Sequence, residues 1–176
     1  MHFGIRIFLI AATFLIAGCK FQPGIGYNKG FSPDQPIAFD HSLHVQKNQI
    51  QCQYCHNQVE RTAHSTIPAL STCMNCHLVI RNRPGTTEES PEIKKLVEAF
   101  NAGESIPWVK VHMLPDHVKF NHSAHIQKGV NCQTCHGQVE TMAKVAQFSD
   151  LSMGWCVNCH REPQHNAPTN CSTCHH

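Results

Sequence analysis

The sequence has little charge and few aromatic residues. Of its 176 residues, 15% are charged and 7% are aromatic, and the formal net charge is +2. That is too little charge for an acidic or basic disordered chain, and it excludes the strongly basic surface that nucleic-acid binding needs. A domain of this length with so few large apolar side chains needs another filler for its core. Cysteine and histidine are abundant and could hold such a filler, since the chain has 11 cysteines and 15 histidines.

The sequence also lacks a long apolar run. Its longest one covers only residues 7–18, directly after Arg6. Such a run barely spans a bilayer as a helix, and its charged flank is typical of an export signal. It ends in Ile16-Ala17-Gly18-Cys19, which resembles the lipobox of bacterial lipoproteins. We therefore expect a signal peptide over 1–18 and a lipid on Cys19. An ordinary signal peptide and an uncleaved anchor helix are the alternatives, and all three place the chain outside the cytoplasm, on the periplasmic side of a bacterial membrane.

The ten other cysteines form five Cys-x-x-Cys pairs, each followed at once by histidine. The pairs are Cys52/Cys55, Cys73/Cys76, Cys132/Cys135, Cys156/Cys159 and Cys171/Cys174, and we number the motifs first to fifth in this order. The histidines that follow them are His56, His77, His136, His160 and His175. Cys-x-x-Cys-His is the attachment signature of c-type haem, in which two thiols form thioethers and the histidine is the proximal iron ligand. Disulfides or zinc sites could also use paired cysteines, but neither needs the histidine. We therefore expect five covalently bound haem c groups.

The motifs recur in two halves. Phe39–His44 and Phe120–His125 both read F-x-H-x-x-H, and we call them the histidine-pair elements. Two Cys-x-x-Cys-His motifs follow each element, and a third ends the second half, which indicates duplication of a two-haem unit. We expect a mainly irregular fold with short α-helices and haems as its core. The expected parts are a lipidated linker over 19–35, a first unit over 36–80, a connector over 81–116 and a second unit over 117–176.

The histidine-pair elements are predicted to supply distal iron ligands, namely His41, His44, His122 and His125. Histidines at i and i+3 on a helical turn lie on nearby faces and can serve two haems. The fifth iron then needs a further ligand, for which His112 and Met153 are candidates. A methionine ligand would raise the potential of its haem, but Met153 could equally pack against a porphyrin edge. Four other histidines are more typical of solvent-exposed residues, namely His64, His117, His165 and His176.

One amphipathic helix is predicted in the connector, from Ser90 to about residue 101. Ser90 suits an N-cap, Pro91 suits the first helical position and Gly103 suits the stop. Its apolar stripe consists of Ile93, Leu96, Val97 and Phe100. We expect this helix to have a structural role.

The arrangement of histidine pairs and motifs resembles the class III multihaem cytochromes. Residues 106–116, 71–77 and 151–156 further resemble the pentahaem cytochrome subunits of alternative complex III. The resemblance implies an electron-transfer subunit, not itself an enzyme, of a membrane-bound quinol:cytochrome c oxidoreductase. It would relay electrons from an iron–sulfur subunit to a monohaem cytochrome or an oxidase. The resemblance also favours His112 and Met153 as the remaining axial ligands.

Two other functions compete with this interpretation. A free-standing, membrane-attached lipoprotein could shuttle electrons to another redox partner. A nitrogen-oxide reductase would need one haem with an open axial position, often marked by a Cys-x-x-Cys-Lys motif, and this sequence contains none. Thiol chemistry at the Cys-x-x-Cys pairs is disfavoured because haem attachment consumes the thiols.

Overall fold

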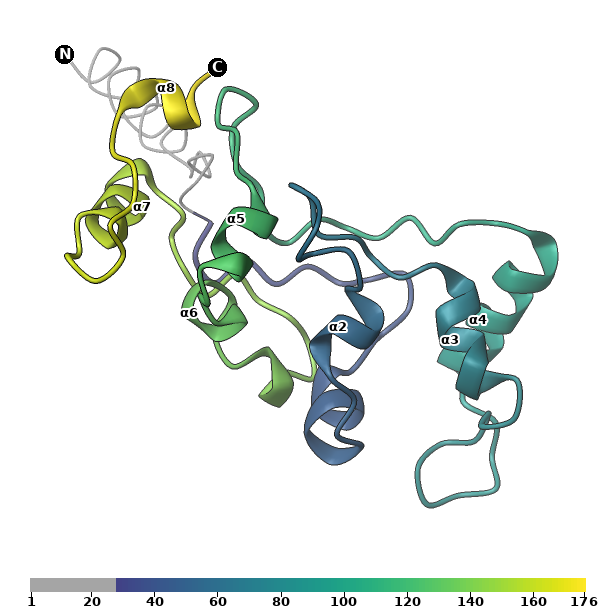
Figure 1. Ribbon diagram of the computed structural model, residues 1–176. Coiled ribbons are helices and arrows are strands. Elements are labelled where there is room, and N and C mark those ends of the chain that lie inside the picture. Colours follow the sequence, from purple (N-terminus) through teal and green to yellow (C-terminus); the bar gives the residue numbers. More distant parts are fainter. Residues whose placement is uncertain (1–27) are drawn as a thin grey trace, which may run out of the picture.

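A computed structural model of the protein describes residues 28–176. The expected signal peptide and the lipidation of Cys19 lie outside the described residues. Helices α3 (Leu70–His77) and α4 (Pro91–Ala102) form one end of an elongated molecule, and α7 (Met153–His160) and α8 (Cys171–Cys174) form the other (Figure 1). Within 28–176, no helix is both long and apolar enough to cross a membrane.

Short helices joined by irregular segments make up the described chain. The remaining elements are η1 (Ser42–Lys47), α2 (Cys52–Cys55), α5 (His122–Gln127), α6 (Cys132–His136) and η2 (Val139–Thr141). In residues 28–176 the only β-pairing is an isolated bridge between Asn82 and Glu89. Each of the five Cys-x-x-Cys pairs lies within a short helix, which confirms the expected fold class.

Helix α4 confirms the amphipathic helix predicted from the sequence. Ser90 precedes it in an extended conformation, and Gly103 ends it with a φ of 69°, a left-handed conformation that favours glycine. Its inner face buries Leu96 against Met74 of α3 and Ile37. The helix therefore packs the connector onto the second motif.

Apolar burial by side chains is sparse in the described residues. The buried hydrophobic residues are Ile37, Val59, Met74 and Leu96. In contrast, Val79 is 87% exposed and Met153 is 67% exposed. So small a core is unusual for a chain of this length. It fits the expectation that covalently held groups provide much of the core.

The segment that begins at residue 28 crosses the middle of the molecule and ties its parts together (Figure 1). The main chain of residues 30–31 exchanges two hydrogen bonds with that of Gln147, at 2.7 and 2.9 Å. Further along, the Gln35 amide both donates to and accepts from the main chain of Val109, each at 2.9 Å. Ile37 then enters the apolar core beside α4. Residues 28–38 thus link the second unit, the connector and the first unit.

The two units dock on each other through equivalent contacts. The amide of Ser123 in α5 donates to Thr62, and the amide of Ser42 in η1 donates to Met142, both at 3.2 Å. Ser42 and Ser123 occupy the same place in the two histidine-pair elements, and each acceptor lies in the loop after the other unit's leading motif. The arrangement therefore resembles the self-complementary interface of a two-fold dimer.

Candidate haem-binding sites

The Cys-x-x-Cys-His spacing and the local helix together determine where the thiols and the imidazole point. Residues at i, i+3 and i+4 lie on one face of a helical turn, so both cysteines and the histidine share a face where the helix includes the histidine, as in α3, α6 and α7. In α2 and α8 the helix ends at the second cysteine, and His56 and His175 follow it in non-helical conformations. Side-chain caps fix the start of two of these helices. The Ser152 hydroxyl accepts from the amide of Trp155 at 3.1 Å, and Asn170 Oδ1 accepts from that of Thr173 at 3.0 Å.

The ten thiols predicted to attach haem are not equally exposed. Six are half-buried and four are exposed, namely Cys52, Cys76, Cys132 and Cys171. In the first, third and fifth motifs the exposed thiol is the first cysteine, but the second motif reverses this order. Its first thiol, Cys73, packs against the apolar core beside α4, which leaves Cys76 as the exposed one. The sequence pattern treats both cysteines of a motif alike, so it did not predict this difference, and haem attachment at Cys76 stays a prediction.

Four of the five motif histidines donate Nδ1–H to a main-chain carbonyl. His56 donates to Thr66, His77 to Ile80 and His160 to Pro168, each at 2.7 Å, and His175 donates to His117 at 2.9 Å. A metal-ligating histidine characteristically makes this contact, because it fixes the tautomer and the ring orientation. It leaves Nε2 free to bind iron. The donor set and its orientation therefore fit haem attachment at these motifs.

The histidine-pair elements are locked in the same way in both units. The Phe39 ring stacks on His44 at 4.3 Å between centroids and meets His41 edge-on at 4.8 Å. Phe120 stacks on His125 at 4.5 Å and meets His122 edge-on at 4.8 Å. The second histidine of each pair also donates Nδ1–H to the carbonyl four residues earlier, at 2.7 and 2.8 Å. The phenylalanine thus contacts both imidazoles of its pair, and the carbonyl orients the second one.

Each second histidine of a pair faces the histidine of the later motif in its unit. The ring centroids of His44 and His77 are 6.0 Å apart, and those of His125 and His160 are 5.9 Å apart. With metal–nitrogen bonds of about 2 Å, two imidazoles on opposite sides of one iron have centroids about 6 Å apart. The structure therefore places these pairs at the separation that shared iron ligation needs.

Each first histidine of a pair lies near the leading motif of its unit. His122 and His136 are 6.4 Å apart with nearly parallel rings, and His122 Nδ1 donates to the carbonyl of Ala63 at 2.9 Å. Burial, followed by the nearby charges of His56 and His44, lowers the pKa of His41 to about 4. His41 is thus neutral at pH 7 and close to His56, as an iron ligand requires.

The two candidates for the remaining ligand lie in different places. The His112 ring is 4.5 Å from that of His136, closer than ligation across an iron allows. Met153 begins α7 with an exposed side chain. The His117 ring lies 5.6 Å from that of His175, but the His117 carbonyl binds His175 Nδ1. This carbonyl therefore holds the orientation of the His175 ring.

The thiols show which motifs are neighbours. Burial most strongly raises the pKa of Cys55, and the next cause is the thiol of Cys73 in the second motif. Burial likewise raises the pKa of Cys132, followed by Cys52, which also hydrogen bonds to it. The first motif therefore lies between the second and the third.

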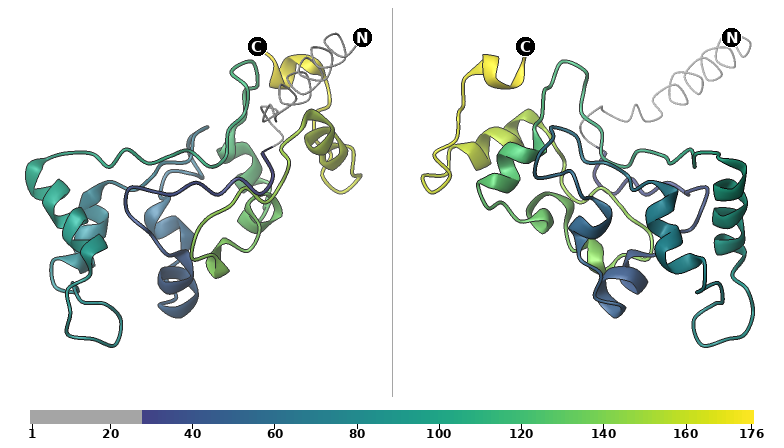
Figure 2. Two further views of the ribbon diagram at one scale, coloured as in Figure 1. Left: turned by 180° about the vertical axis from the view of Figure 1, so that it is seen from behind. Right: turned by 45° about the vertical axis from the view of Figure 1, so that its right-hand side comes forward.

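The same evidence orders the rest of the second unit. After burial, the thiols of Cys159 and Cys156 raise the pKa of Cys135, which joins the third motif to the fourth. After burial, Cys174 raises the pKa of Cys156, which joins the fourth motif to the fifth. The motifs thus follow one another in the order second, first, third, fourth, fifth. The ribbon shows the same succession across the molecule, as α3, α2, α6, α7 and α8 (Figures 1 and 2).

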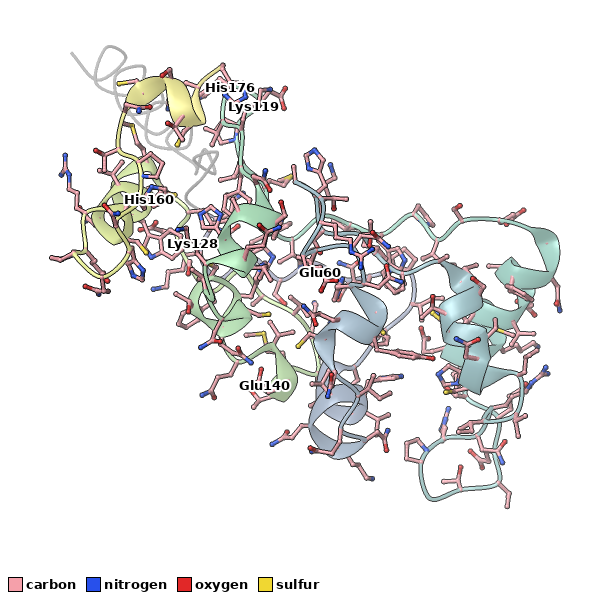
Figure 3. All side chains as sticks on the ribbon, in the orientation of Figure 1. Glu60, Lys119, Lys128, Glu140, His160 and His176 are labelled. Carbon is pink, nitrogen blue, oxygen red and sulfur yellow. The ribbon has the colours of Figure 1, made fainter. Side chains whose placement is uncertain are left out.

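The fifth motif is fastened to the segment that leads into α5. The amide of Lys119 donates to the carbonyl of Cys174 at 2.8 Å, beside the contact between His117 and His175. Lys119 and His176 lie together next to α8, whereas His160 lies on neighbouring α7 (Figure 3). Sequence reasoning missed these main-chain clamps and the role of the phenylalanines. The recurrence of Phe39 and Phe120 in register was the available signal for the latter.

Disulfides and metal clusters are the other uses of such residues. The ten cysteines between residues 52 and 174 are free thiols. Across the part of the chain that the structure describes, no three or more His, Cys, Asp or Glu side chains gather in an arrangement that could hold a metal ion. Around the second, third and fourth motifs, an imidazole from a histidine-pair element faces the motif histidine instead.

Comparison with known proteins agrees with this geometry. The family described as cytochrome c7 and related cytochrome c matches residues 37–92 and 118–176, which separates the two units at the connector. The chain is also 26% identical over 166 residues to the menaquinone reductase multihaem cytochrome c subunit of Nitratidesulfovibrio vulgaris strain Hildenborough. That alignment covers 81% of this chain and 77% of the relative. This chain belongs to the family of cytochrome c7 and related multihaem cytochromes c, with the family domain present twice.

Proposed function

We propose that this protein is a pentahaem electron-transfer wire in a membrane-bound quinol:cytochrome c oxidoreductase of the alternative complex III type. The observation that carries the proposal is the succession of the motif helices along the molecule, α3, α2, α6, α7 and α8, with neighbouring thiols from each motif to the next (Figures 1 and 2). Haem c at each motif supplies a one-electron Fe(III)/Fe(II) couple. The chain holds these sites in a row, so the second and fifth motifs are the ends at which partners exchange electrons.

The proposed axial pairs follow the repeat. They are His41 with His56, His44 with His77, His122 with His136, His125 with His160 and Met153 with His175. The separations of about 6 Å support the second, third and fourth of these pairs. Met153 is assigned by its position, because α7 carries Cys156, the neighbour of Cys174. Filled axial positions leave no place for a substrate, which favours electron carriage over catalysis.

The ligand types also suggest a direction. Histidine–methionine ligation raises a haem potential relative to ligation by two histidines. Met153 would therefore make the fifth motif the high-potential end, which faces the acceptor, a monohaem cytochrome or an oxidase. The second motif would then receive electrons from an iron–sulfur subunit. Hydrogen bonds from Nδ1 to fixed carbonyls hold four of the five motif imidazoles in one orientation, so little rearrangement accompanies a change of charge at those sites.

The choice of complex rests on two similarities. The relative from N. vulgaris is named as a subunit of menaquinone reductase, which supports a quinone-linked complex. Residues 106–116, leading into the second histidine-pair element, favour a complex that oxidises quinol. The lipobox-like residues 16–19 support attachment on the periplasmic side of a bacterial membrane through a lipid on Cys19.

The test uses the full chain purified from membranes with whatever accompanies it. We expect a haemochrome assay to give five haems per chain. Low-temperature EPR and near-infrared magnetic circular dichroism should show low-spin haem throughout, four sites with two histidines and one with histidine and methionine. A high-spin haem that binds nitrite would overturn the wire and favour a nitrogen-oxide reductase.

Native electrophoresis tests the complex. The proposal expects the five-haem band to migrate with quinol:cytochrome c reductase activity and with an iron–sulfur subunit. A band that carries haem alone, separate from that activity, would identify the protein as a free-standing lipoprotein shuttle. Mass spectrometry of the N-terminal peptide reports independently whether Cys19 carries acyl chains.

A further inference from the structure

His136 differs from the other four motif histidines in its surroundings. His56, His77, His160 and His175 each donate Nδ1–H to a carbonyl at 2.7–2.9 Å. Among the side-chain hydrogen bonds of residues 28–176, this carbonyl contact is found for those four motif histidines and not for His136. A ligating imidazole normally needs an Nδ1 acceptor to hold its tautomer and orientation. The histidine of the third motif therefore lacks the carbonyl acceptor for Nδ1–H that the other four motif histidines have.

His112 has a ring nitrogen that lacks a hydrogen-bond partner. Its Nε2 is buried without a hydrogen-bond partner, and its ring lies 4.5 Å from that of His136 at an interplanar angle of 74°. Burial, then the neighbouring His122, lowers the pKa of His112. A neutral imidazole keeps one acceptor nitrogen, and leaving it buried and unpaired costs free energy.

A different histidine, His122, is placed to be the second iron ligand at the third site. The His122 ring stands 6.4 Å from that of His136, close to the separation of about 6 Å for two imidazoles across one iron. The carbonyl of Ala63 holds His122 Nδ1 and leaves its Nε2 free. At 4.5 Å, His112 is too close to share an iron with His136, so it is available for the Nδ1 side.

We infer that His112 is a positioning residue whose Nε2 accepts the hydrogen bond from His136 Nδ1 in the loaded protein. This inference rests on the proposed function, because it assumes that His136 binds iron. The third motif would then have an imidazole–imidazole pair where the other motifs have imidazole–carbonyl pairs. A strong acceptor at Nδ1 makes the ligand more basic. It therefore stabilises the oxidised iron and lowers the potential at the centre of the row.

Three variants of the full protein test this role. His112→Leu removes the acceptor, whereas His112→Gln keeps one in its amide oxygen. His64→Leu is the matched control, because His64 is an exposed histidine outside the proposed sites. We expect all three to contain five low-spin haems. In His112→Leu, one midpoint potential should shift upward and one low-spin EPR signal should move, whereas His112→Gln should restore most of both and His64→Leu should change neither.

Two results would overturn the inference. A high-spin, CO-binding haem in His112→Leu would show that His112 is an iron ligand. Unchanged midpoint potentials in His112→Leu would show that His112 does not position His136. If His112→Leu fails to assemble, His122→Ala decides the question: one new CO-binding haem is expected, and an all-low-spin spectrum would contradict the assignment. The wild-type spectrum separates this test from the proposed function, which fails if a high-spin haem is present before any substitution.

Discussion

The two units carry the same motifs but bury different residues. In the first unit, Ile37 and Met74 are buried with Leu96 of the connector helix α4. In the second unit the buried side chains are polar, and Gln147 is 1% exposed next to buried Ser149. Gln147 Nε2 donates to the carbonyl of Ser149, and its main chain bonds to that of residues 30 and 31. Apolar packing thus stabilises the first unit, whereas hydrogen bonds and close backbone contacts stabilise the second.

The same divergence reaches the residues around the proposed ligands. Ser42 and Ser123 make equivalent contacts with the opposite unit, so the docking of the duplicated elements is retained. Yet His122 Nδ1 donates to Ala63, whereas His41 Nδ1 is buried without a partner. Partners of a ligating histidine tune its metal. Duplication therefore kept the positions of the imidazoles and let their hydrogen-bond partners differ, which is one way to give repeated sites different potentials.

The largest expected difference between the units is at Met74 and its counterpart Val157. Met74 is 2% exposed, whereas Val157 is only partly buried. Truncating a buried methionine leaves a cavity, so Met74→Ala should lower the free energy of unfolding by about 2–4 kcal/mol. Val157→Ala should cost about 1 kcal/mol, since less apolar surface is lost. Guanidinium unfolding followed by far-ultraviolet circular dichroism measures both.

If Met74→Ala and Val157→Ala lower the free energy of unfolding equally, the two units do not differ in apolar packing. Hydrogen exchange provides the site-specific control. The Met74 variant should expose the amides of α4, which packs on that residue, and leave those of α7 unchanged.

Exchanging the residues that follow the leading motifs, Gly137 and Asn57, tests how the two units differ in backbone packing. Gly137 has φ 71° and ψ −169°, a conformation nearly restricted to glycine, and a Cβ there would lie 2.6 Å from Phe148 Cγ. Its counterpart in the first unit is Asn57, whose φ is not positive. Gly137→Asn should therefore cost about 1–3 kcal/mol from strain alone. Asn57→Gly should cost under about 1 kcal/mol, an effect of chain entropy.

Thermal unfolding of the two swapped variants gives the comparison directly. If Gly137→Asn unfolds at the wild-type temperature, the loop after the third motif is not packed as described. The haem content of each variant is the control, because a variant that has lost a haem reports on attachment rather than on the loop.

The sequence predicts the local parts of this molecule well. The five motif helices and α4 follow from spacing, caps and an apolar stripe, and the structure contains them. The pairing of His44 with His77 and of His125 with His160 agrees with the i, i+3 argument, although the ligand roles remain predictions. These features are local or repeated, so the spacing of residue types along the sequence predicts them.

The order of the motifs could not be predicted from the sequence. It depends on how the units dock, and the contacts of Ser42 with Met142 and of Ser123 with Thr62 are main-chain hydrogen bonds. Such bonds do not depend on side-chain identity, so they leave no signal in the residue types. The approach of His112 to His136 was hidden for a related reason. The connector reaches the third motif through an irregular segment without any periodic pattern.

The smallest expected effects concern the residue that opens each histidine-pair helix. Asp40 Oδ1 accepts from the amide of Leu43 at 3.1 Å, and Asn121 Oδ1 accepts from that of Ala124 at 3.3 Å. Burial alone would raise the pKa of Asp40, but its hydrogen bonds outweigh this and hold the pKa below the ordinary value. Loss of such a cap costs about 1 kcal/mol, so Asp40→Ala and Asn121→Ala should be equally destabilised.

The reciprocal exchanges Asp40→Asn and Asn121→Asp keep the acceptor and should change stability by less than about 0.5 kcal/mol, because the two residues cap almost equally well. The unfolding midpoints of all four variants test whether the caps are interchangeable. A large loss in Asp40→Asn alone would mean that the first unit needs the negative charge beside His41, whose Nδ1 has no partner. The units would then differ in electrostatics as well as in packing, and the charge at Asp40 would be one cause of unequal potentials at otherwise equivalent sites.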